Sequence, residues 1–279
     1  MNFDFEIVLG TANLENNYGV TKANLLSYKN FNKIVENCES IEYLDVAGSY
    51  KGVEEVCLQK RKRTLKLFSK LYFHEYKDNF ENTKLSRYKD RIVLIHNWDE
   101  LSQYGKSRAL DILINDKKNN KILGFGFSNY KNFYVPSFIN HDDEFYIQTP
   151  LNILNQKNKF FIEKLKLQYP KIKIFARSIF LQGLLIDSTI IEKYKNNRDL
   201  IKFNNFCIQN RIENVKMCLA YLVSQKNIDG IVIGVNNFNQ ITEILTHLKD
   251  LKLNDLIELD WDYFASQNEE LTDPRTWTI

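Results

Sequence analysis

Short apolar segments recur along the chain, and each of them ends in small or polar residues. Longer amphipathic stretches lie between them, a pattern that is typical of repeated strand–helix units. The predicted strands are EIVLGTAN (6–13), IEYLDVAG (41–48), TLKLFSKL (64–71), RIVLIHNW (91–98), KILGFGFSN (121–129), FYIQTPLN (145–152), IKIFARSI (172–179) and GIVIGVNN (230–237).

The stretches between these strands repeat apolar residues at the i, i+3, i+4 and i+7 spacing of amphipathic helices. Helices are predicted at 24–38, 101–116, 159–168, 203–225 and 237–249, whereas the third and fifth connections are poorly marked. Eight nearly continuous apolar strands favour a closed parallel barrel over an open sheet, and no GxGxxG motif follows the first strand. We therefore expect residues 1–279 to form one α/β domain, a (β/α)8 TIM barrel with its active site at the carboxyl ends of the strands.

Composition narrows the function classes. With 38 basic and 35 acidic residues the net charge is +3, which is too balanced to indicate a nucleic-acid or membrane partner. No apolar run approaches the ~18 residues of a membrane-spanning helix, and the N-terminus lacks the positive charge of a signal peptide. We expect a cytoplasmic monomer or small homo-oligomer.

The basic run 60–63 is interpreted as the solvated last turn of a helix. The cysteines are interpreted as buried thiols: Cys38, Cys57, Cys207 and Cys218.

Polar residues gather at the ends of the predicted strands. They are Asp45, Tyr50 in the loop after it, Lys70, His96, Asn129, Gln148 and Arg177. In a barrel these positions share one face, so the side chains would converge on one mouth. Taken alone, Lys70 is more often a surface lysine and His96 a hydrogen-bonded core histidine. Together with Asp45 they indicate a site, because each would be costly to desolvate without a partner.

This set of side chains suits proton donation to a carbonyl oxygen. A tyrosine phenol has an unperturbed pKa of ~10 and is a sluggish acid at neutral pH. A nearby ammonium at Lys70 favours the phenolate and lowers the pKa of Tyr50, while Asp45 would hold Lys70 charged and aimed. His96 would orient the substrate oxygen or share in the proton transfer.

Seven motifs follow one another over almost the whole chain: DxAxxY (45–50), SK (69–70), LIH (94–96), GFSN (126–129), IQTPLN (147–152), ARSIFLQGLL (176–185) and IVIGVNNFNQITEIL (231–245). In this order they resemble the aldo-keto reductase family. The family consists of (β/α)8 barrels that reduce carbonyl groups with NAD(P)H, so the resemblance implies that fold and that activity. The segment GTANLENNYGV (10–20) and the ending DPRTW (273–277) look most similar to bacterial members found among surface-polysaccharide genes.

The resemblance also implies roles for individual residues. Tyr50 matches the general acid of the family, Lys70 and Asp45 match the pair that tunes it, and His96 matches the group that orients the substrate. Ser128, Asn129 and Gln148 match positions that grip the nicotinamide carboxamide, a role suited to groups that both donate and accept. The full set of implied cofactor contacts is Thr11, Ser128, Asn129, Gln148, Arg177, Ser178, Gly234, Asn236, Gln240 and Glu243.

Two positions depart from the family pattern. Arg177 stands where many members stack an aromatic ring on the nicotinamide; a guanidinium also stacks, but its charge disfavours the oxidised ring. The segment 234–244 offers amides where NADPH-preferring members place a cation for the 2′-phosphate. The cofactor is therefore expected to be NADP(H) or NAD(H), with weaker discrimination against NADH than is usual in the family.

The expected substrate is a small carbonyl compound. Tyr18 and Trp98 would form aromatic walls of its pocket, or else simply cover the barrel top; with Asn97 nearby, such walls would accept a sugar-like carbonyl. A different function also stays open, in which the barrel binds a cofactor but acts as a redox sensor or partner-binding subunit. A metal-dependent hydrolase is poorly supported and no metal is expected, because the histidines away from strand ends lack ligand-like spacing: His74, His141 and His247.

Overall fold

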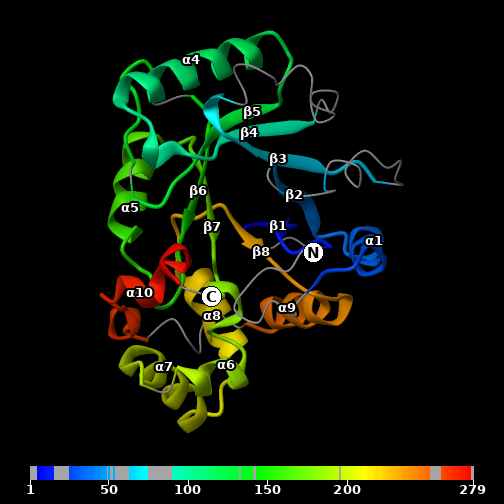
Figure 1. Ribbon diagram of the computed structural model, residues 1–279, viewed down its shortest axis with the longest axis vertical. Helices are drawn as coiled ribbons and strands as arrows, with labels where there is room; N and C mark the ends of the chain where they lie inside the picture. Colours follow the sequence, from blue (N-terminus) through cyan, green and yellow to red (C-terminus); the bar gives the residue numbers. More distant parts are fainter. Residues whose placement is uncertain are drawn as a thin grey trace.

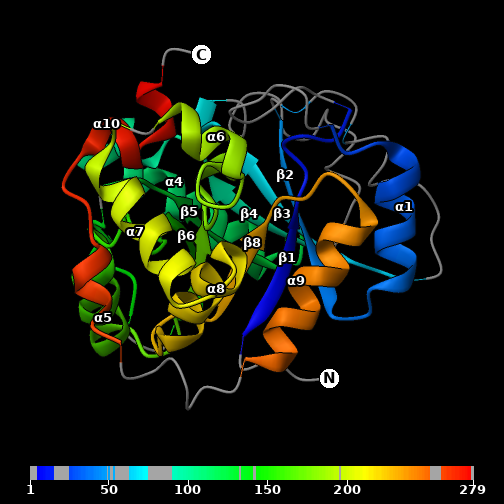
Figure 2. The same cartoon turned by 90° about the horizontal axis from the view of Figure 1, so that it is seen from below.

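The computed structural model describes residues 5–15, 25–48, 50, 53, 63–74, 90–131, 133–140, 143–194, 196–251 and 259–277. Eight parallel strands close into a barrel, in which β1 is hydrogen-bonded to both β2 and β8 (Figures 1 and 2). The strands are β1 Glu6–Gly10, β2 Ile41–Ala47, β3 Lys66–Leu71, β4 Arg91–Ile95, β5 Gly124–Ser128, β6 Tyr146–Pro150, β7 Lys173–Arg177 and β8 Gly230–Ile233. Each lies inside a predicted strand, so the predicted (β/α)8 barrel is confirmed.

Helices surround the barrel on its outside (Figure 2). The α-helices are α1 Tyr28–Asn37, α4 Gln103–Lys118, α5 Lys159–Gln168, α6 Ser188–Lys193, α7 Arg198–Gln209, α8 Asn214–Ser224, α9 Phe238–Asp250 and α10 Glu269–Thr272. Short 3-10 helices are η3 Trp98–Glu100, η4 Leu181–Gly183, η6 Trp261–Phe264 and η7 Pro274–Thr276. Within the described ranges, no helix is both long and apolar enough to cross a membrane.

Side-chain caps fix where several of these helices begin. Ser27 accepts a hydrogen bond from the Asn30 N–H at the start of α1, and Asn237 accepts one from the Gln240 N–H at the start of α9. Such caps satisfy N–H groups that have no partner within the helix. The start of α9 is therefore fixed next to the end of β8.

Two local predictions need correction. The predicted helix 203–225 is two helices, α7 and α8, because the backbone turns between them and Arg211 adopts a left-handed φ of 56°. Arg63, from the basic run, does not simply face solvent: its guanidinium donates to the carbonyl oxygens of Cys38, Glu39 and Ile41. It therefore ties the end of α1 to the start of β2. The other residues of the run, 60–62, lie outside the described ranges.

The cysteines within the described residues are free and buried, as predicted: Cys38, Cys207 and Cys218. Cys57 lies outside those residues.

The lower part of the barrel interior is filled by an aromatic plug. Residues at alternate strand positions point inward and form a cluster of their own, separate from the core between strands and helices: Val8, Tyr43, Phe68, Ile92, Leu94, Phe175 and Val232, with Tyr146 packed against it. The Phe68 ring lies 4.7 Å from Phe175 and 5.3 Å from Tyr43, centroid to centroid. Intervening strand residues point outward and pack against the helices.

Gly230 leaves room for this plug. A Cβ added there would lie 2.4 Å from a ring carbon of Phe175 and 2.7 Å from the carbonyl oxygen of Glu6. We expect Gly230→Ala to lower the free energy of unfolding by about 1–3 kcal/mol, because the ring and a β1 carbonyl must both shift. Urea unfolding followed by circular dichroism measures this loss.

Gly234→Ala is the matched control, because a Cβ at Gly234 would meet no atom within 4 Å. Equal loss of stability in both variants would mean that crowding against Phe175 is not the cause.

Candidate active site

The polar site lies directly above the aromatic plug, because inward-facing strand positions recur every second residue. Each of five plug residues is followed two positions later by a polar residue, giving the pairs Tyr43 and Asp45, Phe68 and Lys70, Leu94 and His96, Tyr146 and Gln148, and Phe175 and Arg177. The strand register places Ala47 beside Lys70 and Pro150 beside Arg177. The alternation therefore delivers the predicted side chains to one rim at the carboxyl ends of the strands.

Lys70 links Asp45 to Tyr50. Its Nζ donates to Asp45 Oδ2 at 2.7 Å and to the Tyr50 hydroxyl at 3.3 Å. The side chains of Lys70 and Asp45 are 6% and 5% exposed, so this ion pair is almost completely removed from water. The proximity of these three groups, on which the chemical interpretation of the sequence depends, is present in the structure.

Asp45 is held from both sides and through its backbone. Its Oδ1 accepts a hydrogen bond from Gln148 Nε2 at 2.9 Å, and its carbonyl oxygen accepts one from Thr11 Oγ1 at 2.7 Å. A buried carboxylate is tolerated only when its oxygens are satisfied. Thr11 and Gln148 therefore fix the position of the carboxylate that orients Lys70.

Lys70 remains a cation in this environment. Burial on its own would lower the pKa of Lys70, but the negative charge of Asp45, with a further contribution from Tyr50 and the hydrogen bond to Asp45, raises that pKa above its ordinary value. Lys70 therefore places a positive charge beside the Tyr50 hydroxyl.

His96 is neutral at physiological pH. Burial, together with the positive charges of Lys70 and Arg177, lowers the pKa of His96 to about 4, against an opposing effect of Asp45. A neutral imidazole carries one N–H donor and one acceptor nitrogen, so it is suited to hydrogen-bond a carbonyl oxygen without adding charge.

A cavity of about 540 Å³ opens at this rim, within the size range of small-molecule sites. Ten of the predicted site residues line it: Asp45, Tyr50, Lys70, His96, Ser128, Arg177, Ser178, Gly234, Asn236 and Gln240.

Five predicted residues lie elsewhere. Thr11, Asn129 and Gln148 are fully buried, and Thr11 and Gln148 serve Asp45 from behind the cavity wall. Glu243 lies near His247 on the outer surface of α9. Trp98 is completely buried and stacks on Phe127 at 4.2 Å, which corrects its assignment as a pocket wall. Tyr18 lies outside the described residues.

Several lining residues escape a reading of the sequence. Asn13, after β1, donates to the Val235 carbonyl and to Asn236 Oδ1, and so joins the ends of β1 and β8. The loop after β7 also lines the cavity, and it adopts left-handed backbone angles at Ser178, Leu181, Gln182 and Gly183. Three of these four residues are not glycine, so composition carries no signal of the conformation.

Arg177 is docked on the cavity wall. Its Nη2 donates to the Asn129 carbonyl at 2.8 Å, and its guanidinium lies 4.0 Å from the centroid of the Tyr130 ring. The guanidinium of Arg275 lies 3.5 Å from the same centroid. Arg177 and Arg275 thus both pack against the Tyr130 ring. The charge of Arg177 is therefore fixed in place at the rim.

Comparisons with known proteins agree with this architecture. No protein-family model matches the chain, and no curated protein matches it. Among solved structures, the apo form of aldo-keto reductase AKR11C1 from Bacillus halodurans has a TM-score of 0.70 at 15% identity, over 98% of this chain and 95% of that one. An aldo-keto reductase from Klebsiella pneumoniae in complex with NADPH has a TM-score of 0.66 at 14% identity, over 98% and 99%. Glycerol dehydrogenase AKR11B4 from Gluconobacter oxydans has a TM-score of 0.58 at 14% identity, over 91% and 93%. The chain thus has the fold of the aldo-keto reductases.

The low pKa of His96 predicts a pH dependence of stability. In the unfolded chain His96 takes up a proton below about 6.5, whereas in the folded chain it stays neutral down to about 4. Between these values the unfolded state binds more protons, so stability falls as the pH drops. This residue should account for a loss of about 3 kcal/mol between pH 7 and pH 4.

Denaturant unfolding across this pH range, on wild type and His96→Asn, isolates the contribution as the difference between the two pH profiles. Parallel profiles would mean that His96 titrates normally in the folded protein.

Proposed function

We propose that this chain is an NAD(P)H-dependent carbonyl reductase of the aldo-keto reductase type. The observation that carries the proposal is the buried ammonium of Lys70, which contacts both Asp45 and the Tyr50 hydroxyl at the wall of a ligand-sized cavity. The fold shared with aldo-keto reductases, one of them solved with NADPH, supports it.

A nicotinamide cofactor fits the residues of this cavity. Gly234 lines the wall, and a side chain there would project into open space, so the glycine keeps that volume free. The first turn of α9 follows directly and offers the electropositive end of a 13-residue helix, which suits a phosphate. Ser128, Ser178 and Gln240 supply hydroxyl and amide groups along the same wall. When bound, the cofactor would supply the hydride.

The side chains of this protein would then handle the proton and the substrate oxygen. Tyr50 gives its hydroxyl proton to the carbonyl oxygen as that oxygen becomes an alkoxide, and the Lys70 ammonium stabilises the phenolate that remains. Neutral His96 hydrogen-bonds the same oxygen and orients it. Asp45 keeps Lys70 aimed, with Thr11 and Gln148 as positioning residues for Asp45. Thr11 and Gln148 would thus act on Asp45 from behind the cavity wall. Asn129 would act there through its carbonyl oxygen, which accepts a hydrogen bond from Arg177.

Arg177 would replace the usual aromatic neighbour of the nicotinamide. One face of its guanidinium lies on Tyr130, and the residue lines the cavity, so its other face is suited to stack on a planar ring. The positive charge favours the neutral reduced ring over the cationic oxidised ring, which would help release of the oxidised cofactor.

The substrate proposed for this site is a small carbonyl compound, with a sugar-like aldehyde or ketone as the first class to test. Burial of Trp98 removes one expected aromatic wall, so this suggestion depends on the polar lining residues Gln182 and Ser188 and on the soft likeness to polysaccharide-associated reductases. A panel of aldoses, keto sugars and simple aldehydes tests it.

Tyr50→Phe is the direct test of the reaction type. It should lower kcat by about 10²–10⁴-fold, because only the proton donor is removed, while the Kd for the cofactor stays nearly unchanged. Stopped-flow turnover and fluorescence titration measure the two quantities. Loss of cofactor binding would contradict the role assigned to Tyr50. Absence of NAD(P)H oxidation by wild type across the whole panel would favour a sensor.

Discrimination between the two cofactors should be weak. The first turn of α9 is Phe238, Asn239, Gln240 and Ile241, without a cation. Asn236 and Asn237 are already engaged, since the Asn236 N–H donates to Gln240 Oε1 and Asn237 caps the helix. We expect NADPH to bind less than a hundredfold more tightly than NADH in parallel fluorescence titrations.

Lys33 of α1 provides the control for that titration, because its Nζ lies 4.2 Å from the ring centroid of Phe238 at the start of α9. A preference of wild type for NADPH of a hundredfold or more contradicts the prediction, and Lys33→Ala then shows whether Lys33 supplies the cation.

A further inference from the structure

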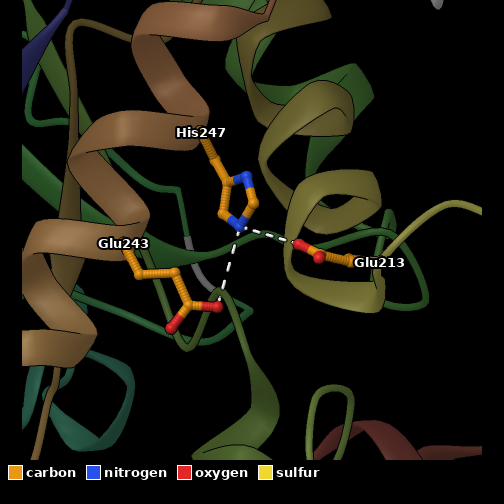
Figure 3. A group of neighbouring side chains, drawn as sticks. All are labelled: Glu213, Glu243 and His247. Atoms are coloured by element: carbon orange, nitrogen blue, oxygen red, sulfur yellow. Dashed lines mark ion pairs between the residues drawn. The ribbon is translucent and has the colours of Figure 1, made fainter.

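Three side chains of metal-ligating type meet on the outer surface, away from the cavity. His247 and Glu243 come from α9, and Glu213 stands at the start of α8 (Figure 3). His247 Nε2 lies 2.9 Å from Glu213 Oε2 and 3.7 Å from Glu243 Oε1. One ligand atom from each residue lies within 4.8 Å of the other two.

The fold explains why these residues converge although the sequence spacing around His247 shows no ligand pattern. Glu243 and His247 are four positions apart and share one face of α9. Helices α8 and α9 pack side by side, so the N-terminal end of α8 brings Glu213 to the same face. Glu213 occupies the N-cap position, yet its carboxylate accepts no hydrogen bond from the helix N–H groups. The carboxylate is turned toward His247 instead (Figure 3).

The contact between His247 and Glu213 is an ion pair that lacks the geometry of a hydrogen bond (Figure 3). Nε2 of His247 is a buried atom with no hydrogen-bond partner among the described residues, although an oxygen of Glu213 lies 2.9 Å away. With the imidazole neutral and its proton on Nδ1, Nε2 and one oxygen of each carboxylate offer lone pairs toward a common point, as metal ligands do. Zinc ligands about 2.0–2.2 Å from a tetrahedral ion lie roughly 3.3 Å from one another. The distances of 2.9 and 3.7 Å lie on either side of that separation.

We propose that Glu213, Glu243 and His247 form a binding site for a divalent transition-metal ion of the zinc type. One imidazole and two carboxylates are a nitrogen–oxygen donor set that suits zinc and is a poor match for magnesium, which takes oxygen ligands and water. The two carboxylates are 67% and 59% exposed, so an ion has a path from solvent, while His247 is anchored at 17% exposure. A fourth position is left for water.

An ion at this site would fasten α8 to α9. Glu243 lies three residues after Gln240, which lines the cavity. The metal therefore acts on the helix whose first turn borders the proposed cofactor site. Binding of the metal ion can be measured directly, independently of any reductase activity.

Zinc titration of the full chain tests the proposal. Competition against a chromophoric chelator should show one Zn²⁺ per chain, and a free zinc concentration about a hundredfold above Kd should raise Tm by about 5 °C. Magnesium at the same concentration should leave Tm unchanged. Glu213→Gln, Glu243→Gln and His247→Asn should each weaken zinc binding at least about tenfold, because amides of similar shape are poor ligands.

Two variants serve as matched controls. His74→Gln removes another exposed histidine and Glu270→Gln removes another exposed glutamate, and both should keep the wild-type Kd for zinc. The proposal is overturned if wild type binds no stoichiometric zinc, or if the three ligand variants bind zinc as tightly as wild type. It is also overturned if His74→Gln abolishes binding while His247→Asn retains it.

Discussion

The constraint on which this structure depends is the two-residue alternation of side chains along barrel strands. Tyr43, Phe68 and Phe175 point into the barrel. The residue two positions after each of them therefore also points inward, one layer closer to the carboxyl ends of the strands. Apolar packing below thus determines which side chains meet above. Asp45, Lys70 and Arg177 come together because their neighbours pack well, although burying the first two as isolated charges would be strongly unfavourable.

The cost of burying Asp45 and Lys70 is offset by the ion pair between them and by their hydrogen bonds. Asp45 receives the Lys70 ammonium on one oxygen and the Gln148 amide on the other, and Thr11 holds its backbone. Removing any one partner leaves a polar group without compensation in a poorly solvated layer. In the proposed reaction, the same low solvation would strengthen the interaction of the ammonium with the Tyr50 oxygen, because water would screen it little. The hydrogen bonds and the ion pair around Asp45 and Lys70 therefore stabilise the fold and also position the groups of the proposed reaction.

The barrel and much of the rim were predictable from sequence because both follow from short-range periodicity. Eight apolar runs located the strands, and the polar residues at their ends include Asp45, Lys70, His96 and Arg177 of the cavity wall. How deeply each side chain is buried was not predictable in this way. Thr11, Gln148 and Trp98 lie in segments that border the cavity, yet their side chains are buried behind its wall. Whether a strand-end residue lines a cavity or supports it depends on neighbouring strands, which no local pattern reports. Likewise, the left-handed backbone at Ser178 and Gln182 is imposed by the packed loop rather than by residue type, and the break between α7 and α8 occurs within a continuous apolar period.

The aromatic plug has a consequence for proton traffic. Phe68, Tyr146 and Phe175 fill the barrel below Lys70 with rings in edge-on and tilted contact. In the proposed reaction, the Tyr50 hydroxyl would be reprotonated from the open mouth, since apolar rings fill the barrel below. A ligand in the mouth would then also control the supply of protons to Tyr50.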